Sequence, residues 1–401
     1  MWVYFDVFWH TGHRNRKRKK LENRGTADST TSGRLSVEPI GWSVGHANWI
    51  YSSVMDNNIE GRKREHLEMV LNKDVSAKGI TTGFGDYFFE HVALPEIDFN
   101  TVDTSISVFG RELASPFLIS SMTGGAQVSL EINLRLAEAA QSMGIAMGIG
   151  SQRAAIEDPS LADTYRVRKA APDILLFANL GAVQLNYGYG LDQVRRAVEL
   201  IEADALFLHL NPLQEVIQTN GNRNWSGLLD KIGTVVEALD VPVVIKEVGN
   251  GISPDIACRA VEKGIAGIDV AGAGGTSWSE VEAFRQEDQL TRDIAHSFSG
   301  WGIPTARALL EVKAALPNIE IFASGGIRNG IDAAKGIRLG ASLIGMAAPL
   351  LASAVATGEE VTDVIKRYTE ELRIAMFCTG SPNLAALRNA RLHRVQDRAH
   401  I

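Results

Sequence analysis

Eight short apolar runs recur along the chain, and longer amphipathic or polar stretches separate them. The runs span residues 117–119, 145–147, 174–177, 205–208, 243–245, 267–270, 319–322 and 343–346. Between them, residues 130–143, 192–201 and 331–339 are typical of amphipathic helices. Continuous apolar runs flanked by helices are what strands of a parallel sheet buried on both faces require. The pattern therefore predicts an α/β fold, a TIM (β/α)8 barrel, and a doubly wound sheet is the alternative.

The chain divides into three parts by the same criterion. Residues 1–54 hold no sustained period and carry eight Lys and Arg against four Asp and Glu, so we expect a disordered extension or one outside the functional protein. The basic run at 14–20 leaves open a nucleic-acid or localisation patch. Residues 55–115 predict an N-terminal arm and a hairpin near 104–110 that closes the barrel floor. Residues 116–401 predict the barrel and C-terminal helices, the last over 360–376.

One interval departs from the regular alternation. Residues 277–302, after the sixth apolar run, are long and polar. A loop of that length in a compact domain is usually functional or mobile, so we expect such a loop here.

Composition limits the partners. The 401 residues are 45% hydrophobic and 22% charged, with a formal net charge of -7. A mildly acidic chain has no global field to hold nucleic acid or an anionic membrane, so an anionic substrate needs a local basic site. Two cysteines exclude a disulfide framework and a Cys-rich metal site. We expect a cytoplasmic protein that acts on a small molecule and has no membrane span.

Small or polar residues follow every expected strand at once. In a barrel of this kind the active site lies at the carboxyl ends of the strands. Any one stretch is explained by turn chemistry, but eight of them in register with eight strands predict one shared site. The stretches are residues 120–125, 148–153, 179–181, 209–215, 246–249, 271–276, 324–328 and 345–348.

Two of these stretches indicate a phosphate. Barrels often bind phosphoryl groups at the loops after strands seven and eight, where backbone N–H groups and helix N-termini meet the ligand. Residues 324–328 offer Gly325, Gly326 and the guanidinium of Arg328, and Ala347 follows the eighth strand. Together with Lys246 on the fifth strand, this pattern favours flavin mononucleotide (FMN).

Further candidates lie before the first expected strand and directly after the fourth. Arg62 and His66 are four residues apart, on one face of a helix, with Lys63 beside them. A solvated basic face is the alternative, but a diphosphate site would need such a group. His209, Asn211, Gln214 and Glu215 follow the fourth strand, and Glu215 could bind Mg²⁺ together with substrate phosphates. Glu247 is interpreted as the ion-pair partner of Lys246.

In order along the chain, these motifs resemble the type 2 isopentenyl diphosphate isomerase family. The resemblance covers about residues 60–390 and leaves out residues 1–54. It is carried by Arg62-Lys63-x-x-His66, 122–125, 150–153, 209–215, 244–249, 269–276, 302–305 and 324–326. It implies interconversion of isopentenyl and dimethylallyl diphosphate, with FMN, Mg²⁺ and NADPH as the flavin reductant. It also implies a homo-oligomer, either a tetramer or an octamer.

The resemblance also assigns roles to residues. The flavin ring and ribityl chain would contact Ser121, Met122, Thr123, Ser151, Asn179, Lys246 and Thr276. The flavin phosphate would contact Gly326, Ile327, Arg328, Ala347 and Ala348. The diphosphate would contact Arg62, Lys63, His66, Ser151 and Arg153. His209, Asn211 and Gln214 would line the alkene, with Gln214 and His209 as catalytic residues, and Glu215 would bind Mg²⁺.

The chemistry fits this set of residues. Moving a double bond requires a proton added at one carbon and another removed two carbons away, and a cationic intermediate needs a dry pocket. Because the barrel offers no obvious strong acid, we expect reduced FMN to act as acid and base while the protein positions the substrate. Two alternatives remain: an FMN-dependent oxidoreductase on the same barrel, and a flavin-binding scaffold without catalysis.

Overall fold

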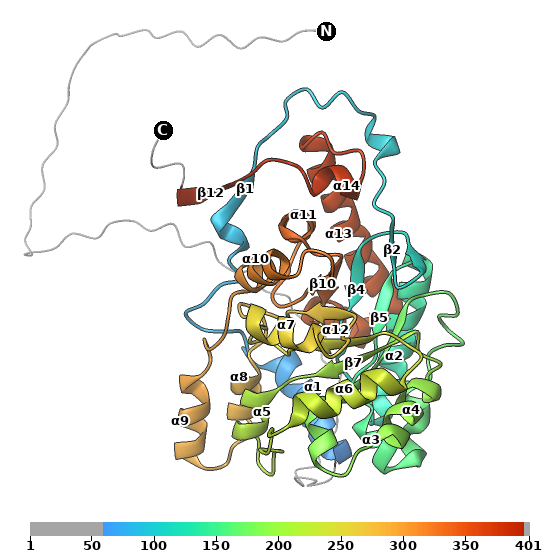
Figure 1. Ribbon diagram of the computed structural model, residues 1–401, viewed down its shortest axis with the longest axis vertical. Coiled ribbons are helices and arrows are strands. Elements are labelled where there is room, and N and C mark those ends of the chain that lie inside the picture. The colour runs from blue at the N-terminus through green and yellow to red at the C-terminus, as the bar shows by residue number, and fades with distance from the viewer. Residues whose placement is uncertain (1–58, 397–401) are drawn as a thin grey trace, which may run out of the picture. The chain divides into compact units, whose positions relative to one another are not determined.

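The computed structural model describes residues 59–396, so the predicted extension over residues 1–54 lies outside the described residues. Its centre is a closed parallel barrel of eight strands in the order β10-β11-β4-β5-β6-β7-β8-β9 (Figure 1). The predicted TIM barrel is thereby confirmed. The strands are β4 (Phe117–Ile119), β5 (Ala146–Gly148), β6 (Leu176–Gly181), β7 (Ala205–His209), β8 (Val243–Lys246), β9 (Gly267–Asp269), β10 (Glu320–Ala323) and β11 (Leu343–Met346).

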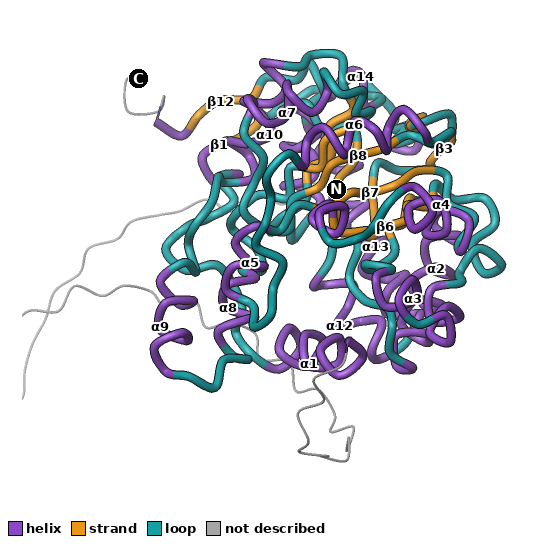
Figure 2. The backbone as a smooth tube through the Cα atoms, turned by 60° about the horizontal axis from the view of Figure 1, so that its bottom comes forward, coloured by secondary structure: helices purple, strands orange, loops and turns teal. Residues whose placement is uncertain are grey.

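Helices surround the strands, as Figure 2 shows in purple and orange. The three helices predicted from periodicity are present as α2 (Gln127–Met143), α4 (Leu191–Leu200) and α11 (Gly330–Leu339), and the closing helix is α13 (Gly358–Cys378). The remaining outer helices are α3 (Arg153–Glu157), α5 (Pro212–Ile217), α6 (Leu228–Ala238), α7 (Pro254–Val261), α10 (Thr305–Ala315), α12 (Ala348–Ala356) and α14 (Leu384–Leu387). None of the helices within residues 59–396 is both long enough and apolar enough to cross a bilayer.

The barrel has an inner and an outer apolar core. Phe177, Phe207 and Phe322 point inward, and the rings of Phe177 and Phe207 stack with centroids 4.3 Å apart. The alternate strand positions face the helices and form the larger cluster. Nearly all strand side chains are buried because helices cover the outside while aromatic rings fill the inside, which explains the continuous apolar runs.

A hairpin closes the floor of the barrel, as predicted. It consists of β2 (Ile106–Val108) and β3 (Arg111–Leu113), and its two-residue turn places Phe109 and Gly110 at φ 49° and 76°. The ring of Phe109 enters the barrel and makes edge contacts with Phe177 and Phe322. The functional end must therefore be the opposite one.

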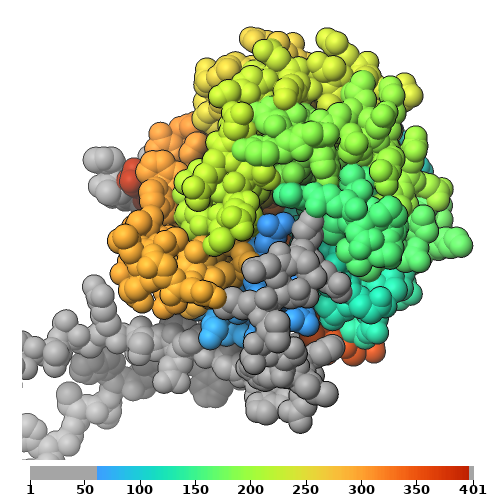
Figure 3. Space-filling view, turned by 90° about the horizontal axis from the view of Figure 1, so that it is seen from below, coloured from blue at the N-terminus to red at the C-terminus, as the bar shows by residue number. Residues whose placement is uncertain are grey.

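The N-terminal arm lies at that opposite end. Helix α1 (Ile59–Asn72) packs against α8 (Trp278–Ala283), and Figure 3 shows blue N-terminal residues at the centre of this face. After α1 the chain runs along the β9 end, where Ala77 N–H donates to Gly275 O at 2.8 Å. It then forms β1 (Tyr87–Phe89), which pairs antiparallel with β12 (Leu392–Arg394) near the C-terminus.

The prediction of a long loop at residues 277–302 is wrong in its structure. This segment forms α8 and α9 (Gln289–Ser297). Ala283 of α8, Ala295 of α9 and Ile217 of α5 share a small apolar core of their own. The segment resembles a loop in sequence because α9 buries only Ala295, whereas α8 buries polar residues such as Glu280 and Glu282. Neither helix therefore carries the apolar stripe by which an amphipathic helix is recognised.

Candidate active site

A cavity of about 230 Å³ opens at the carboxyl ends of the barrel strands, beneath α1. Every residue that the sequence assigned to flavin, substrate or metal lines it. These residues are Arg62, Lys63, His66, Ser121, Met122, Thr123, Ser151, Arg153, Asn179, His209, Asn211, Gln214, Glu215, Lys246, Thr276, Gly326, Ile327, Arg328, Ala347 and Ala348.

The loops after β10 and β11 form a cradle of bare backbone. Gly326 has φ 77°, and a Cβ built on it would lie 2.5 Å from Thr82 Cγ2 and 2.6 Å from the Gly274 carbonyl oxygen. Helix α12 begins beside this cradle with no side-chain cap at Ala347. In the described chain no hydrogen bond or ion pair holds the exposed Arg328 guanidinium. In the first turn of α12, Pro349 has no N–H, and the N–H groups of Leu350 and Leu351 donate to Ala347 O, so an anion there would meet the Ala348 N–H and the unpaired Arg328 cation.

The helix after β10, α11, does not offer the free N-terminus that the sequence predicted for phosphate binding. Asn329 caps the N-terminus of α11 and accepts a hydrogen bond from Asp332 N–H at 2.7 Å. Part of that helix's positive end is therefore already satisfied by the chain itself. Of the two helix N-termini, α12 is the one left open to a ligand.

Buried polar atoms without partners lie along the inner wall. Ser120 Oγ and Ser121 Oγ, directly after β4, accept or donate no hydrogen bond within residues 59–396, and both residues line the cavity. Such atoms are rare in folded proteins, and in a cavity wall they are free to bind a ligand. A polar heterocycle with hydroxyls, such as a flavin with its ribityl chain, matches this need.

Lys246 reaches the cavity from β8. Its Nζ donates to the Glu247 backbone oxygen at 2.8 Å, and burial lowers its pKa while nearby Asp269 and Glu247 oppose that effect. The predicted ion pair with Glu247 is wrong as a direct contact within the described chain. Instead, Glu247 Oε2 accepts the backbone N–H groups of residues 248–250 at 2.6–2.8 Å.

Glu247 is buried, and its carboxylate holds the loop after β8. Burial raises its pKa to about 7, against the lowering effect of the three N–H groups and Lys246. Its carboxylate shapes the loop after β8, because three successive N–H groups converge on one oxygen. Lys246 is thereby left to face the cavity.

His209, at the end of β7, is a neutral side chain. Burial lowers its pKa to about 3, and the nearby charges of Lys246 and Lys63 act in the same direction. Its Nδ1 lies 2.9 Å from Asn179 Oδ1, while Asn179 Nδ2 donates to the Ile149 carbonyl oxygen at 3.1 Å. This arrangement assigns the proton to Nδ1, so Nε2 carries a lone pair.

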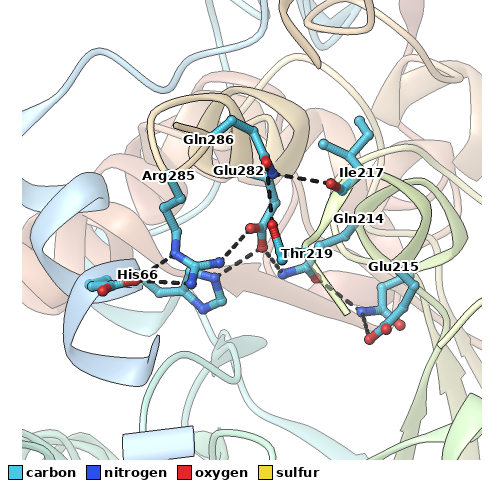
Figure 4. A network of polar contacts seen from close by, with 10 residues as sticks. His66, Gln214, Glu215, Ile217, Thr219, Glu282, Arg285 and Gln286 are labelled. Atoms are coloured by element: carbon cyan, nitrogen blue, oxygen red, sulfur yellow. Dashed lines mark hydrogen bonds and ion pairs between the residues drawn. The ribbon is translucent and has the colours of Figure 1, made fainter. Parts of the chain in front are cut away.

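Gln214 is held at both ends of its amide (Figure 4). Its Nε2 donates to Glu282 Oε1 at 2.9 Å, and its Oε1 accepts from Asn211 Nδ2 at 3.0 Å. The same Glu282 oxygen lies 2.9 Å from His66 Nε2, and Oε2 pairs with Arg285 at 2.6 Å. A single buried carboxylate on α8 therefore links α1 to α5.

Sequence reasoning missed Glu282 and Arg285. Burial opposes ionisation of Glu282, but His66, Arg285 and the Gln214 amide lower its pKa to about 2, so it stays anionic. The available signal was the segment 277–302 itself, because acidic residues after a barrel strand lie at the functional end. Its apparent loop character concealed that Glu282 sits on a helix.

Glu215 presents one carboxylate to the cavity. Its Oε1 accepts from Asn211 Nδ2 at 3.1 Å, and its Oε2 accepts from the Asn222 backbone N–H at 2.5 Å. Among the described residues no cluster of three His, Cys, Asp or Glu side chains forms a complete metal cage. Glu215 could thus hold a hard cation only together with a ligand's oxygens or water.

The cations gather on the side of α1. Burial lowers the pKa of Arg62 and brings that of Lys63 to about 8, with Arg62 and Arg153 acting in the same direction. Arg153 donates its Nε to Glu157 at 2.7 Å. Three cations that raise one another's electrostatic energy form a site suited to a multivalent anion. The alternative of a solvated basic face is wrong for Arg62 and Lys63, which line the cavity.

Comparisons with known proteins agree with this geometry. The family described as FMN-dependent dehydrogenase matches residues 55–165 and 202–394. Isopentenyl-diphosphate delta-isomerase from Synechocystis sp. is 58% identical over 326 residues, which cover 81% of this chain and 93% of that protein. The enzyme of that name from Stutzerimonas stutzeri is 55% identical over 338 residues, covering 84% and 97%.

Among solved structures, a flavocytochrome b2 variant matches with a TM-score of 0.61 and 20% identity over 84% of each chain, which supports the fold alone. The two sequence relatives carry the finer assignment, since more than half of their residues are identical over nearly their full length. The chain therefore belongs to the FMN-dependent dehydrogenase family and, within it, to the isopentenyl-diphosphate delta-isomerases.

Proposed function

We propose that this protein interconverts isopentenyl and dimethylallyl diphosphate, with FMN as cofactor and Mg²⁺ on the diphosphate. The observation that carries the proposal is the convergence of two sets of residues in one cavity. The cations of α1 and Arg153 line the same cavity as Glu215 and the oriented amide of Gln214. An oxidoreductase of small hydroxy acids needs no such combination of a multivalent anion site and a fixed neutral amide.

The residues that line the cavity fit FMN. The backbone cradle at Gly326 would hold the phosphate with Arg328 and the open N-terminus of α12. The unpartnered hydroxyls after β4 and the Asn179 and Thr276 positions would meet the ring and ribityl chain, with Lys246 facing the ring. When bound and reduced, FMN supplies an electron-rich face and an acid–base group next to the alkene.

The diphosphate would lie under α1. Arg62, Lys63 and His66 would hold it together with Ser151 and Arg153. Glu215, whose carboxylate is fixed by two N–H donors, would hold Mg²⁺, which would neutralise part of the diphosphate charge. This grip anchors the substrate without attacking it, so the binding energy orients the alkene end.

The remaining residues keep the reacting end dry and oriented. His209 is neutral at working pH and places an aprotic ring nitrogen, rather than a charge, beside the alkene. Gln214 cannot rotate its amide freely because both ends are engaged, so one geometry faces the substrate. A neutral wall near the alkene avoids repelling the cationic character that develops as a proton is added.

Several finer points belong to the same proposal. NADPH as the reductant of the flavin and a homo-oligomer of four or eight chains follow from the resemblance to the isomerase family, and a cytoplasmic location follows from the low cysteine content. They extend the proposal beyond the cavity and each needs its own measurement.

The decisive experiment is an anaerobic assay on the purified full-length chain with isopentenyl diphosphate, FMN, Mg²⁺ and NADPH, repeated with the flavin left oxidised. Dimethylallyl diphosphate that forms only with reduced flavin, without matching NADPH consumption, supports the isomerase. NADPH consumed in step with product supports the oxidoreductase. No product from protein that holds reducible FMN rejects the isomerase and leaves the binding scaffold.

A further inference from the structure

Asn222 joins the two charged groups that the proposed function assigns to the metal and the diphosphate. Its backbone N–H donates to Glu215 Oε2 at 2.5 Å. Its side-chain Oδ1 accepts from Arg153 Nη1 at 3.1 Å and from Gln184 Nε2 at 3.2 Å. A single residue on the loop after α5 therefore contacts a cavity carboxylate and a cavity guanidinium at once.

The loop that carries Asn222 is held in place by its own contacts. Trp225 Nε1 donates to the Asn222 carbonyl oxygen at 3.0 Å, and Asn224 N–H donates to Tyr187 Oη at 2.8 Å. Gly221 lies so close to α5 that a Cβ on it would meet the Glu215 carbonyl oxygen at 1.9 Å. Asn222 is thus pressed against α5 from a loop fixed on its far side.

Arg153 and Glu215 each keep hydrogen-bonding positions that a ligand in the cavity could use. Arg153 uses Nε for Glu157 and Nη1 for Asn222, and its Nη2 makes no hydrogen bond in the described chain. Each oxygen of Glu215 accepts one N–H and retains a second acceptor position. Long side chains lose rotamer freedom when they bind a ligand, and tethers that hold them beforehand lower this cost.

We propose that Asn222 is a positioning residue for diphosphate and metal binding. Its side-chain oxygen fixes the guanidinium plane of Arg153 toward the diphosphate, and its backbone N–H fixes Glu215 toward the cation. The proposal rests on the proposed function, because that function assigns the diphosphate and Mg²⁺ to these two residues.

The test is a calorimetric titration of FMN-loaded protein with inorganic pyrophosphate, with and without Mg²⁺. N222A removes the acceptor for Arg153 and is expected to weaken pyrophosphate binding about tenfold, the typical value of a hydrogen bond to a charged group. N224A is the matched control, since Asn224 lies on the same loop and, among residues 59–396, its side chain accepts only from Ser226 N–H. Its affinity should stay within about twofold of wild type, as for surface substitutions.

A double-mutant cycle separates positioning from a general loosening of the loop. If Asn222 acts through Arg153, the double variant R153A/N222A binds pyrophosphate no more weakly than R153A alone. In the assay, N222A should raise KM with kcat within about twofold, since uniform binding is lost and not chemistry. FMN content should be unchanged.

A second variant addresses the metal side. G221A should displace the loop from α5 and reduce the gain in pyrophosphate affinity that Mg²⁺ gives, whereas N222A should keep that gain because its backbone N–H remains. Pyrophosphate binding by N222A at the wild-type level, or full multiplication of the two losses in R153A/N222A, overturns the proposal. Since the titration needs no turnover, a wild-type protein that makes no dimethylallyl diphosphate rejects the proposed function separately.

Discussion

Gln214 donates its side-chain N–H to Glu282 at 2.9 Å across 68 positions of sequence. The carboxylate that receives it is buried and also pairs with His66 and Arg285. The orientation of a neutral amide at the cavity is therefore set by an anion on a helix that sequence analysis read as a loop. Helix α8 gives the site its geometry, while α1 and α5 supply the groups that face the ligand.

Replacing Glu282 by Gln should lower kcat about 100-fold, the scale expected when a misplaced group spoils alignment. The neutral amide loses the charge that pairs with Arg285 and can turn its own N–H toward Gln214. The measurement is isomerisation rate together with bound FMN, which should remain. E280Q is the matched control: Glu280 is buried on the same helix but pairs with His296, which does not line the cavity, whereas Glu282 holds the cavity residues His66 and Gln214. Equal losses in both variants would indicate that α8 has simply unfolded.

Replacing Gly326 by Ala should abolish tight FMN binding, because the added Cβ would lie 2.5 Å from Thr82 Cγ2 and 2.6 Å from the Gly274 carbonyl oxygen and would displace the loop that forms the cradle. Backbone strain alone costs about 1 kcal/mol at positive φ. G110A measures that cost, since Gly110 has φ 76° and open space around its Cβ position. Flavin fluorescence titration gives the affinity and thermal melts give the stability. Flavin affinity lost in both variants contradicts the cradle.

Diphosphate affinity should fall as pH rises through about 8. The pKa of Lys63 is lowered to about 8 by burial, so its cation is present below that pH and lost above it. Pyrophosphate titrations between pH 7 and 9 on wild type and K63R isolate this effect, because both proteins see the same ionisation of the ligand. K63R, whose guanidinium stays charged, should show the shallower decline. Identical declines would exclude Lys63 as the titrating group.

The same shift has a consequence for stability. Between pH 8 and 10.5 the unfolded chain holds a proton on Lys63 that the folded chain has released. The unfolding free energy contributed by this residue therefore rises with pH over that window. K63M should remove the rise, which denaturant melts at several pH values can measure.

Replacing Phe109 by Ala should destabilise the protein by about 2 kcal/mol, less than a fully buried Phe would lose. The ring plugs the floor of the barrel against Phe177 and Phe322, at the end away from the cavity. FMN affinity and kcat should be unchanged in the folded variant. L94A, at a side chain that is 74% exposed, is the control and should stay within about 0.5 kcal/mol. Lost FMN affinity in F109A would show that the two barrel ends are coupled.

The barrel strands and the functional end of the barrel could be predicted from local sequence. The eight apolar runs predicted most strand ends to within about two residues. They could do so because a strand that is covered on both faces consists of continuous apolar residues. The Gly-rich and polar stretches after them identified the functional end, since parallel strands bring their carboxyl ends together. Arg62, Lys63 and His66 lie in the cavity as expected, since helical spacing places them on neighbouring positions of α1.

What the tertiary structure decided is which side chains meet. Glu247 binds three backbone N–H groups and does not pair with Lys246, because the chain after β8 folds back over the Glu247 carboxylate. No pattern in the sequence predicts that loop conformation. Glu282 reached Gln214, and Asn222 reached Glu215 and Arg153, through packing of α8 and a loop against α5. Hydrophobic periodicity fixes elements and their buried faces, which are local properties. The partners of polar side chains depend on where distant elements dock, and only the folded chain determines that.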